Sequence, residues 1–298
     1  MTVNIQAYET LSDAASKGNV KKVKALIKKG AKVNTRDEGG WTALMKAAMF
    51  GHADVAEILL KKGADIDAKD KEGITAIMIA AGMGKLETVQ VLLDHNANVN
   101  LQNSEGICAL MAANWVGHTD VVLLLIEKGA DVNIKDINGI TALMTAAKYE
   151  QTDTVKALLE KGADTLAKDQ DGVTALMEAA GTNDTESVEL LLKYGADINA
   201  RDNDGATALL WAADNGQTEM ISILLANGAD VNATDNNGTT ALIGAAKQGQ
   251  IETVKTLLQK GSDISIKNKN GLNAIEAAES KNHKDIIELL IKQDRRNK

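Results

Sequence analysis

The chain has 298 residues, of which 44% are apolar, and it carries a formal net charge of −8. This acidic balance disfavours nucleic acid and anionic membrane as partners, because both attract basic proteins. The single cysteine, Cys108, excludes an internal disulfide, and no apolar run approaches the ~18 residues that cross a bilayer. Residues 1–10 lack the features of a secretion signal. We therefore expect a cytoplasmic protein by default, or a periplasmic or secreted one if a leader has been removed.

A repeated glycine organises the chain. Alanine stands three residues after each occurrence of this glycine. The glycine recurs every 33 residues, at Gly40, Gly73, Gly106, Gly139, Gly172, Gly205, Gly238 and Gly271. A fixed period of this length predicts an array of similar repeats, each of which touches only its neighbours. We expect a single repeat domain over residues 7–292, followed by a short tail at 293–298. Within it we expect an N-terminal capping repeat (7–35), seven internal repeats (36–267) and a C-terminal capping repeat (268–292).

The first repeat carries Lys22 at the position where internal repeats carry Val55 or Val89. The last repeat carries Glu279 at the position of a repeated alanine, on the side that has no further neighbour. Polar residues on these terminal faces keep an open-ended core soluble. We interpret both repeats as caps.

The sequence of each internal repeat predicts a turn followed by two helices. In the turn Asp37–Gly40, the aspartate is expected to accept hydrogen bonds from its own backbone and the glycine to adopt a positive φ. Thr42 is expected to cap a first helix from Ala43 to about Phe50. A second helix with an apolar stripe follows between Gly51 and Gly63. Neither helix can bury its apolar side alone, so stacking of the repeats supplies the core.

Some repeats depart from this pattern. Asn114 replaces a repeated alanine, so its amide must find a partner or cost ~1–3 kcal/mol. Glu150 and Asn183 replace the glycine between the two helices, and Thr165-Leu166 replaces Val-Asn. Asn tolerates a positive φ but Glu does so poorly. We hypothesise that the fifth and sixth repeats bend or loosen the stack.

The repeated residues resemble the ankyrin repeat. The resemblance rests on Gly-x-Thr-x-Leu at the first helix and on Gly-Ala-Asp-Val-Asn at Gly129–Asn133 and Gly228–Asn232, and it covers nearly the whole chain. The family's Thr-Pro-Leu-His reads Thr-Ala-Leu-Met here, at Thr42–Met45, Thr141–Met144 and Thr174–Met177. The chain thus lacks the family's proline, whose fixed φ suits the first helical position. Methionine fills the space of the family's histidine.

This resemblance implies an all-α fold: an ankyrin-repeat solenoid of helix-turn-helix units with short hairpin-like turns, elongated and curved. It also implies a binding scaffold without catalytic chemistry. In such arrays the turn tips and the exposed side of the first helix line a concave surface that meets partners.

The residues themselves give no sign of catalysis. Three of the four histidines, His52, His118 and His283, share one position of the repeat, where we expect them to begin the second helix. Their repeats are not adjacent, so no two of them can share a metal ion. Cys108 stands at the position of Thr42 with no activating group nearby, which favours a semi-buried structural thiol. We expect no enzyme activity, no metal and no cofactor.

Basic residues form a column directly before the turn aspartates. Its members are Arg36, Lys69, Lys135, Lys168, Arg201 and Lys267. We interpret the column as local pairing with the neighbouring aspartates, worth a few tenths of a kcal/mol per exposed pair. The alternative is a basic track for an anionic partner.

The aromatic residues carry the clearest functional signal, because none of the seven occupies a core position of the repeat. Along the first half of the array the exposed positions are apolar or aromatic, whereas the second half is mostly polar. Tyr8 and Trp41 begin this gradient, and Tyr194 lies late in a second helix. The predicted partner-binding residues are Trp41, Met49, Phe50, Ile74, Met83, Ile107, Trp115, Val116, Ile140, Tyr149 and Trp211. The alternative is that large side chains at helix ends only cover neighbouring turns.

We therefore expect a recognition scaffold, monomeric on its own, that binds a folded partner protein through its concave face. Inhibition of a partner enzyme, or protection against one, is the specific form that we expect. The alternative is an adaptor that holds two protein partners, one on its apolar half and one on its polar half. The stoichiometry of the complex distinguishes the two.

Overall fold

The computed structural model describes residues 9–296, which form eighteen helices and no strand. The helices follow one another in pairs, which confirms the all-α fold of repeating helix-turn-helix units. Their bounds are α1 (Leu11–Ser16), α2 (Val20–Lys28), α3 (Ala43–Phe50), α4 (Ala53–Lys61), α5 (Ala76–Gly82), α6 (Leu86–Asp94), α7 (Ala109–Val116), α8 (Thr119–Glu127), α9 (Ala142–Lys148), α10 (Thr152–Glu160), α11 (Ala175–Thr182), α12 (Thr185–Lys193), α13 (Ala208–Asp214), α14 (Thr218–Ala226), α15 (Ala241–Gln248), α16 (Ile251–Gln259), α17 (Ala274–Glu279) and α18 (Lys284–Arg296).

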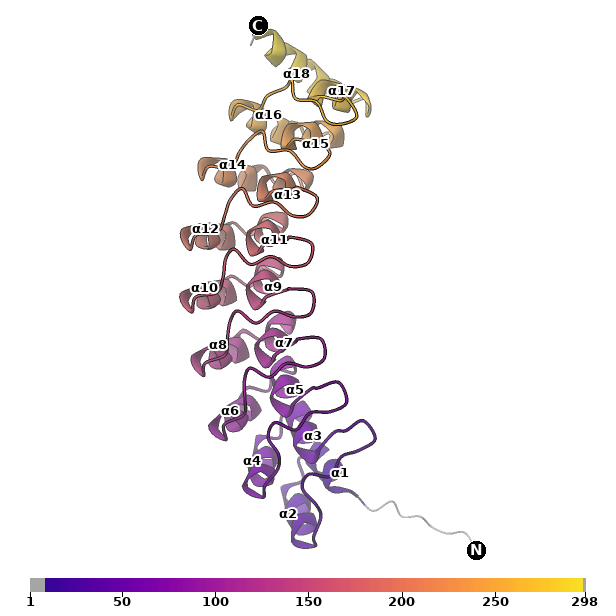
Figure 1. Cartoon of the computed structure of the whole chain (residues 1–298), viewed down its shortest axis with the longest axis vertical. Coiled ribbons are helices and arrows are strands. Elements are labelled where there is room, and N and C mark those ends of the chain that lie inside the picture. Colours follow the sequence, from indigo (N-terminus) through magenta and orange to yellow (C-terminus); the bar gives the residue numbers. More distant parts are fainter. Residues whose placement is uncertain (1–8, 297–298) are drawn as a thin grey trace, which may run out of the picture. The chain divides into compact units, whose positions relative to one another are not determined.

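Tertiary contacts divide the chain into two compact units. Unit 1 extends to Thr145 and includes Glu160–Gly162, whereas unit 2 comprises Ala146–Leu159 and the residues from Ala163 onward. In unit 1 the first helices α1, α3, α5 and α7 pack in succession, and the second helices α2, α4, α6 and α8 form a row beside them (Figure 1). Unit 2 repeats the pattern, with α11, α13, α15 and α17 in one row. The core of each unit lies between its rows.

The turn before each first helix is closed by its own aspartate. Asp37 Oδ1 accepts from the backbone nitrogens of Gly39 and Trp41, at 3.0 and 2.8 Å. The backbone then folds back as a short hairpin, and in two repeats it forms an isolated antiparallel bridge, one of which joins Lys135 and Thr141. Gly40 has a φ of 87°, and a Cβ there would lie 3.2 Å from the backbone nitrogen of Lys71. The turn therefore requires glycine both for its conformation and for the approach of the next repeat.

The first helices begin at the predicted threonine and bury their small residues. Thr42 Oγ1 accepts from the backbone nitrogen of Met45 at 3.3 Å, and the Met45 sulfur receives the Thr42 N–H at 3.4 Å. Methionine at the family's histidine position thus supplies a weak acceptor and a fully buried apolar side chain. Ala47 and Ala48 are also fully buried. Because they are small, the first helices of adjacent repeats approach closely.

Histidine side chains link adjacent repeats at the start of the second helices. His52 and His118 are the N-cap residues of α4 and α8, and His283 directly precedes α18, as predicted. The Nε2 atom of His52 lies 3.0 Å from the carbonyl oxygen of Ser16 in the preceding repeat. A Cβ on Gly18 would lie 2.6 Å from the same imidazole ring. The glycine between two helices therefore also leaves room for the histidine of the next repeat.

Members of the basic column donate to backbone carbonyl oxygens one repeat ahead, which corrects the expected pairing with the turn aspartates for Arg36, Lys69 and Arg201. Arg36 donates to the carbonyl oxygen of Lys69, and Lys69 Nζ donates to that of Gln102 at 3.0 Å. In unit 2, Lys168 Nζ donates to the Arg201 carbonyl oxygen at 2.7 Å. One oxygen of each turn aspartate, such as Asp37 Oδ1, accepts from its own turn, whereas the carbonyl oxygen one repeat ahead lies within reach of the cations. These hydrogen bonds hold adjacent repeats together.

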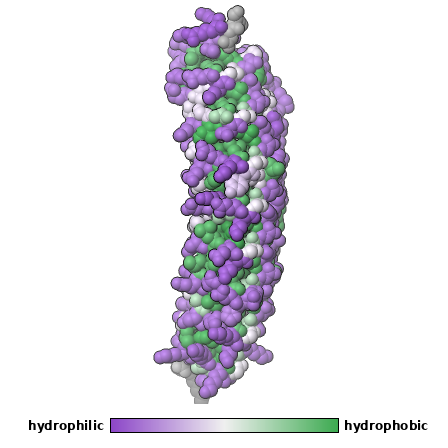
Figure 2. Space-filling view, turned by 90° about the vertical axis from the view of Figure 1, so that its left-hand side faces the viewer, coloured by the Kyte–Doolittle hydropathy of each residue, from purple (hydrophilic) through white to green (hydrophobic). Residues whose placement is uncertain are grey.

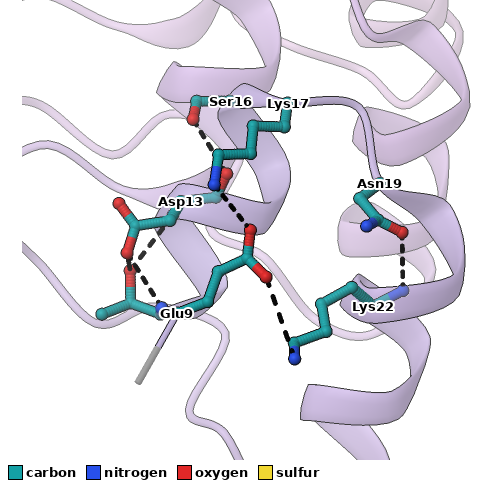
Figure 3. A network of polar contacts seen from close by, with 7 residues as sticks. Glu9, Asp13, Ser16, Lys17, Asn19 and Lys22 are labelled. Carbon is teal, nitrogen blue, oxygen red and sulfur yellow. Dashed lines mark hydrogen bonds and ion pairs between the residues drawn. The ribbon is translucent and has the colours of Figure 1, made fainter. Parts of the chain in front are cut away.

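The N-terminal repeat is closed by a small polar network (Figure 3). The Glu9 carboxylate lies 2.9 Å from Lys17 Nζ and 3.8 Å from Lys22 Nζ. The hydrogen bond that Lys17 donates to Glu9 raises the pKa of Lys17. Lys22 is half-buried. Tyr8, the first residue of the aromatic gradient, lies outside the described residues.

The C-terminal repeat ends in a long helix. Glu279, which the sequence predicts to lie on a capping face, is exposed. Helix α18 continues to Arg296, beyond the array end expected at residue 292. The residues after 292 are mostly good helix formers, and no glycine interrupts them, so the helix extends into the predicted tail.

The irregular repeats keep the usual backbone conformation between their helices. Glu150 has a φ of 54° and Asn183 a φ of 67°, in the left-handed region that Gly117 occupies with 84°. Glu150 and Asn183 therefore adopt the backbone conformation that glycine has at this position in other repeats. For Glu150, the clash of its Cβ makes this unfavourable.

Leu166 removes a link between repeats. At the equivalent position one repeat further on, Asn199 Nδ2 donates to the carbonyl oxygen of Gly228 at 3.4 Å, and its Oδ1 accepts from the backbone nitrogen of Asp230 at 2.9 Å. Leucine can make neither bond, and its side chain is 58% exposed. The repeat that begins near Asp169 thus lacks a link that its neighbours have.

Candidate functional site

Several predicted partner-binding residues are exposed at the ends of the first helices of unit 1. Phe50 ends α3, Met83 follows α5, and Trp115 and Val116 end α7. All four side chains are exposed, and Trp115 is 57% exposed. Because α3, α5 and α7 pack side by side, these ends are neighbours. We call these four residues the first-helix patch.

A cleft of about 180 Å³ opens beside Trp115. Four of the predicted residues line it, namely Ile107, Trp115, Val116 and Ile140, together with Met111, Ala112, Asp136 and Thr145. All of these residues belong to unit 1. The walls are mostly apolar, and Asp136 is the one carboxylate among the lining residues. We call this space the Trp115 cleft.

Asn114 anchors the helix that carries Trp115. Its side chain is fully buried, and Nδ2 donates to the carbonyl oxygen of Ala142 at 2.7 Å. The amide thus finds the partner that its burial requires. The bond ties the end of α7 to the first residue of α9, and it places Trp115 on the outer side of the helix.

The described residues offer little for covalent chemistry. Cys108 is buried at the N-cap of α7, and burial raises the pKa of its thiol, which disfavours the reactive thiolate. Within residues 9–296 no three His, Cys, Asp or Glu side chains are grouped to hold a metal ion. No helix in this range is both long and apolar enough to cross a membrane. The exposed apolar side chains of unit 1 are suited instead to contact with another macromolecule.

A family model for three consecutive ankyrin repeats matches residues 3–70, 65–136, 133–202 and 201–268. The chain belongs to the ankyrin-repeat family. Ankyrin repeats generally mediate protein–protein interaction, and the family is typically a non-enzymatic scaffold. A comparison with curated proteins found no match.

One exposed residue of this ankyrin-repeat protein escaped the sequence comparison. Ile137 lies at a turn tip next to Asp136 and is 60% exposed. The equivalent residue is polar in every other repeat with a complete turn: Glu38, Lys71, Ser104, Gln170, Asn203, Asn236 and Lys269. The signal in the sequence is a single isoleucine at a position that is otherwise polar. Ile137 extends the apolar surface outward from the Trp115 cleft.

Two predicted tryptophans contact residues of their own or the preceding repeat. Lys46 Nζ lies 4.4 Å from the ring centroid of Trp41, a cation–π contact that partly covers the ring. In unit 2, Trp211 Nε1 donates to Asp202 at 3.0 Å, and a Cβ on Gly181 would lie 3.1 Å from the Trp211 ring. Both tryptophans are half-buried. Their surroundings therefore favour packing more than those of Trp115 do.

The remaining predicted residues are divided between the two units. Met49 and Ile74 are half-buried in unit 1, beside the first-helix patch in sequence. Tyr149 is exposed and belongs to unit 2, as Trp211 does.

Unit 1 also exposes apolar side chains on its second helices, which Figure 2 faces. Leu86 of α6 and Leu123 of α8 are exposed and line a shallow groove with acidic residues around it, including Glu87, Asp120 and Glu127. No predicted partner-binding residue lies there. Leu123, 44% exposed, offers a matched control for substitutions at Trp115.

Proposed function

We propose that this ankyrin-repeat protein binds a folded partner protein through the first-helix patch and the Trp115 cleft. It acts, in this proposal, as a monomer with one array over residues 7–292, and it inhibits a partner enzyme or protects against one. The observation that supports the proposal is an exposed tryptophan beside an apolar cleft, with further exposed apolar side chains around it. Tryptophan is enriched among the residues that dominate binding energy at interfaces.

The test compares Trp115→Ala with Leu123→Ala in affinity capture from a cell lysate. A protein that wild type and Leu123→Ala retain, and that Trp115→Ala loses, is the partner. Removal of an interface tryptophan costs about 2 kcal/mol or more, which is about 30-fold in affinity. The melting temperatures of both variants should match that of wild type, because both side chains are largely exposed. A Trp115→Ala variant that binds normally, or that unfolds early, contradicts the proposal.

The inhibitory form needs a separate measurement. If the captured partner is an enzyme, its activity should fall in proportion to the added ankyrin-repeat protein, up to a one-to-one ratio. An enzyme that stays fully active in the saturated complex contradicts inhibition but leaves the binding surface in place.

An adaptor with two partners is the second candidate. The position that carries Phe50, Met83 and Val116 in unit 1 carries Tyr149 at the start of unit 2 and the exposed polar residues Asn215 and Gln248 further along it. This contrast favours two surfaces of different chemistry. A captured complex that contains two different partners, only one of which is lost with Trp115→Ala, supports the adaptor.

A further inference from the structure

We propose that the Trp115 cleft takes a basic side chain, lysine or arginine, from the partner. The charged group binds the Asp136 carboxylate, and the methylene groups rest on Ile107, Ile140 and Trp115. This inference rests on the proposed function and names the chemistry that the partner must present.

The Asp136 carboxylate has one oxygen committed and one available. Its Oδ1 accepts from the backbone nitrogens of Asn138 and Ile140, each at 2.8 Å, as in the other turns. Its Oδ2 has no hydrogen-bond or ion-pair partner among residues 9–296. Asp136 lines the Trp115 cleft and is half-buried, so a group inside the cleft can reach it.

The same chain shows what the second oxygen of such an aspartate binds. Asp37 Oδ2 lies 3.4 Å from Lys46 Nζ, and that ammonium group also lies over the ring of Trp41. Asp202 Oδ2 accepts from Trp211 Nε1 at 3.0 Å. In both repeats the donor stands nine residues after the aspartate, on the first helix.

Nine residues after Asp136 stands Thr145, whose side chain is too short to donate to the second oxygen of the aspartate. Its hydroxyl instead donates to the carbonyl oxygen of Thr141 at 3.3 Å. The preceding repeat also carries a small residue, Ala112, at this position. The Trp115 cleft is thus the space that a side chain like Lys46 fills elsewhere in the chain.

The size and polarity of the cleft favour one amphipathic side chain. An apolar cavity of about 150 Å³ holds a benzene molecule, so a cleft of about 180 Å³ takes a single side chain. Lysine and arginine combine an apolar stem with a charged end, which matches apolar walls beside one carboxylate. No lysine or arginine is among the lining residues. A purely apolar side chain would desolvate Asp136 without compensation, which is unfavourable.

The test uses two blocked amino acids as probes, N-acetyl-arginine amide and N-acetyl-norleucine amide, with binding followed by NMR at the Trp115 indole N–H and the Ile140 amide. Arginine amide should shift both signals, and norleucine amide should bind at least tenfold more weakly. Asp136→Asn should weaken arginine binding at least tenfold. One repeat earlier the equivalent residue is Asn103, whose side-chain oxygen accepts from the backbone nitrogens of Glu105 and Ile107. The substitution therefore keeps the turn. Thr145→Lys should block the cleft in the way that Lys46 covers Asp37.

Equal binding of the two probes, no binding of arginine amide, or an unchanged affinity in Asp136→Asn overturns this inference. Asp169→Asn, which makes the same change in a turn of unit 2, is the control and should have no effect. The captured partner separates the two proposals. A partner lost with Trp115→Ala but bound normally by Asp136→Asn supports the docking surface and overturns the basic side chain. A partner unaffected by either substitution overturns both.

Discussion

Replacing Leu166 by asparagine should stabilise the protein, because it restores a link that the neighbouring repeats have. Asn199 shows the geometry: its amide donates to Gly228 and accepts from Asp230 in the next repeat. Asparagine at position 166 should make the same two bonds, to the carbonyl oxygen of Gly195 and from the backbone nitrogen of Asp197.

The magnitude follows from two opposing contributions. Two hydrogen bonds contribute about 0.5–1.5 kcal/mol each, and solvent exposure with a donor distance of 3.4 Å at Asn199 favours the lower end. Leu166 is 58% exposed, so its removal gives up less than half of the roughly 1.5–3 kcal/mol that full burial of a leucine contributes. With about 0.75 kcal/mol for each bond and about 1 kcal/mol for the lost burial, the net gain is about 0.5 kcal/mol. Asn199→Leu, the reverse change one repeat later, should destabilise by a similar amount.

Two measurements check this prediction. Urea unfolding should show a higher midpoint for Leu166→Asn and a lower one for Asn199→Leu. Hydrogen exchange should show that the Asp197 amide becomes protected in Leu166→Asn and that the Asp230 amide loses protection in Asn199→Leu. If Leu166→Asn raises the midpoint without protecting the Asp197 amide, the gain has another origin and the reasoning is wrong.

Two further substitutions test local strain and charge. Glu150→Gly should raise the free energy of unfolding by about 0.5–1 kcal/mol, which shows as a higher urea midpoint, because relief of about 1–2 kcal/mol of left-handed strain exceeds the entropy that glycine adds to the unfolded chain. Glu150→Ala keeps the Cβ and should give no such gain. Burial, and then repulsion from Asp235, raise the folded-state pKa of Asp214 above its usual value of 3.8, so its ionised form disfavours folding above that folded-state pKa. Asp214→Asn should therefore stabilise the protein at pH 7, and the difference should vanish as the pH falls below 3.8; an equal gain at pH 7 and at pH 3 would contradict this cause.

Features that depend on neighbouring residues in the chain were predictable from the sequence. The turn at Asp37–Gly40 and the cap at Thr42 are made by bonds across two to four residues, so residue type and spacing suffice to predict them. The fold follows from the repetition of these local signals together with the buried alanines. The expected histidine positions also hold, because the same residue recurs at one position of the repeat.

Features that depend on the next repeat were harder to predict. The acceptor of Lys69 is a backbone carbonyl, which every residue has, so nothing in the sequence marks it. The Trp115 cleft exists because Ala112 and Thr145 are small, and a search for large functional side chains overlooks small ones. Trp41 and Trp211 look like Trp115 in the sequence, but each is covered by residues of its own or the preceding repeat. Exposure, and not residue type, distinguishes Trp115.

The donation of Arg36 and Lys69 to main-chain oxygens has an evolutionary consequence. A side chain that recognises a carbonyl group places no demand on the identity of the residue that carries it. Whole repeats can therefore be duplicated, deleted or exchanged by recombination without a compensating change in the neighbour. The array can in this way lengthen and diversify its exposed positions while the contacts that hold it together persist.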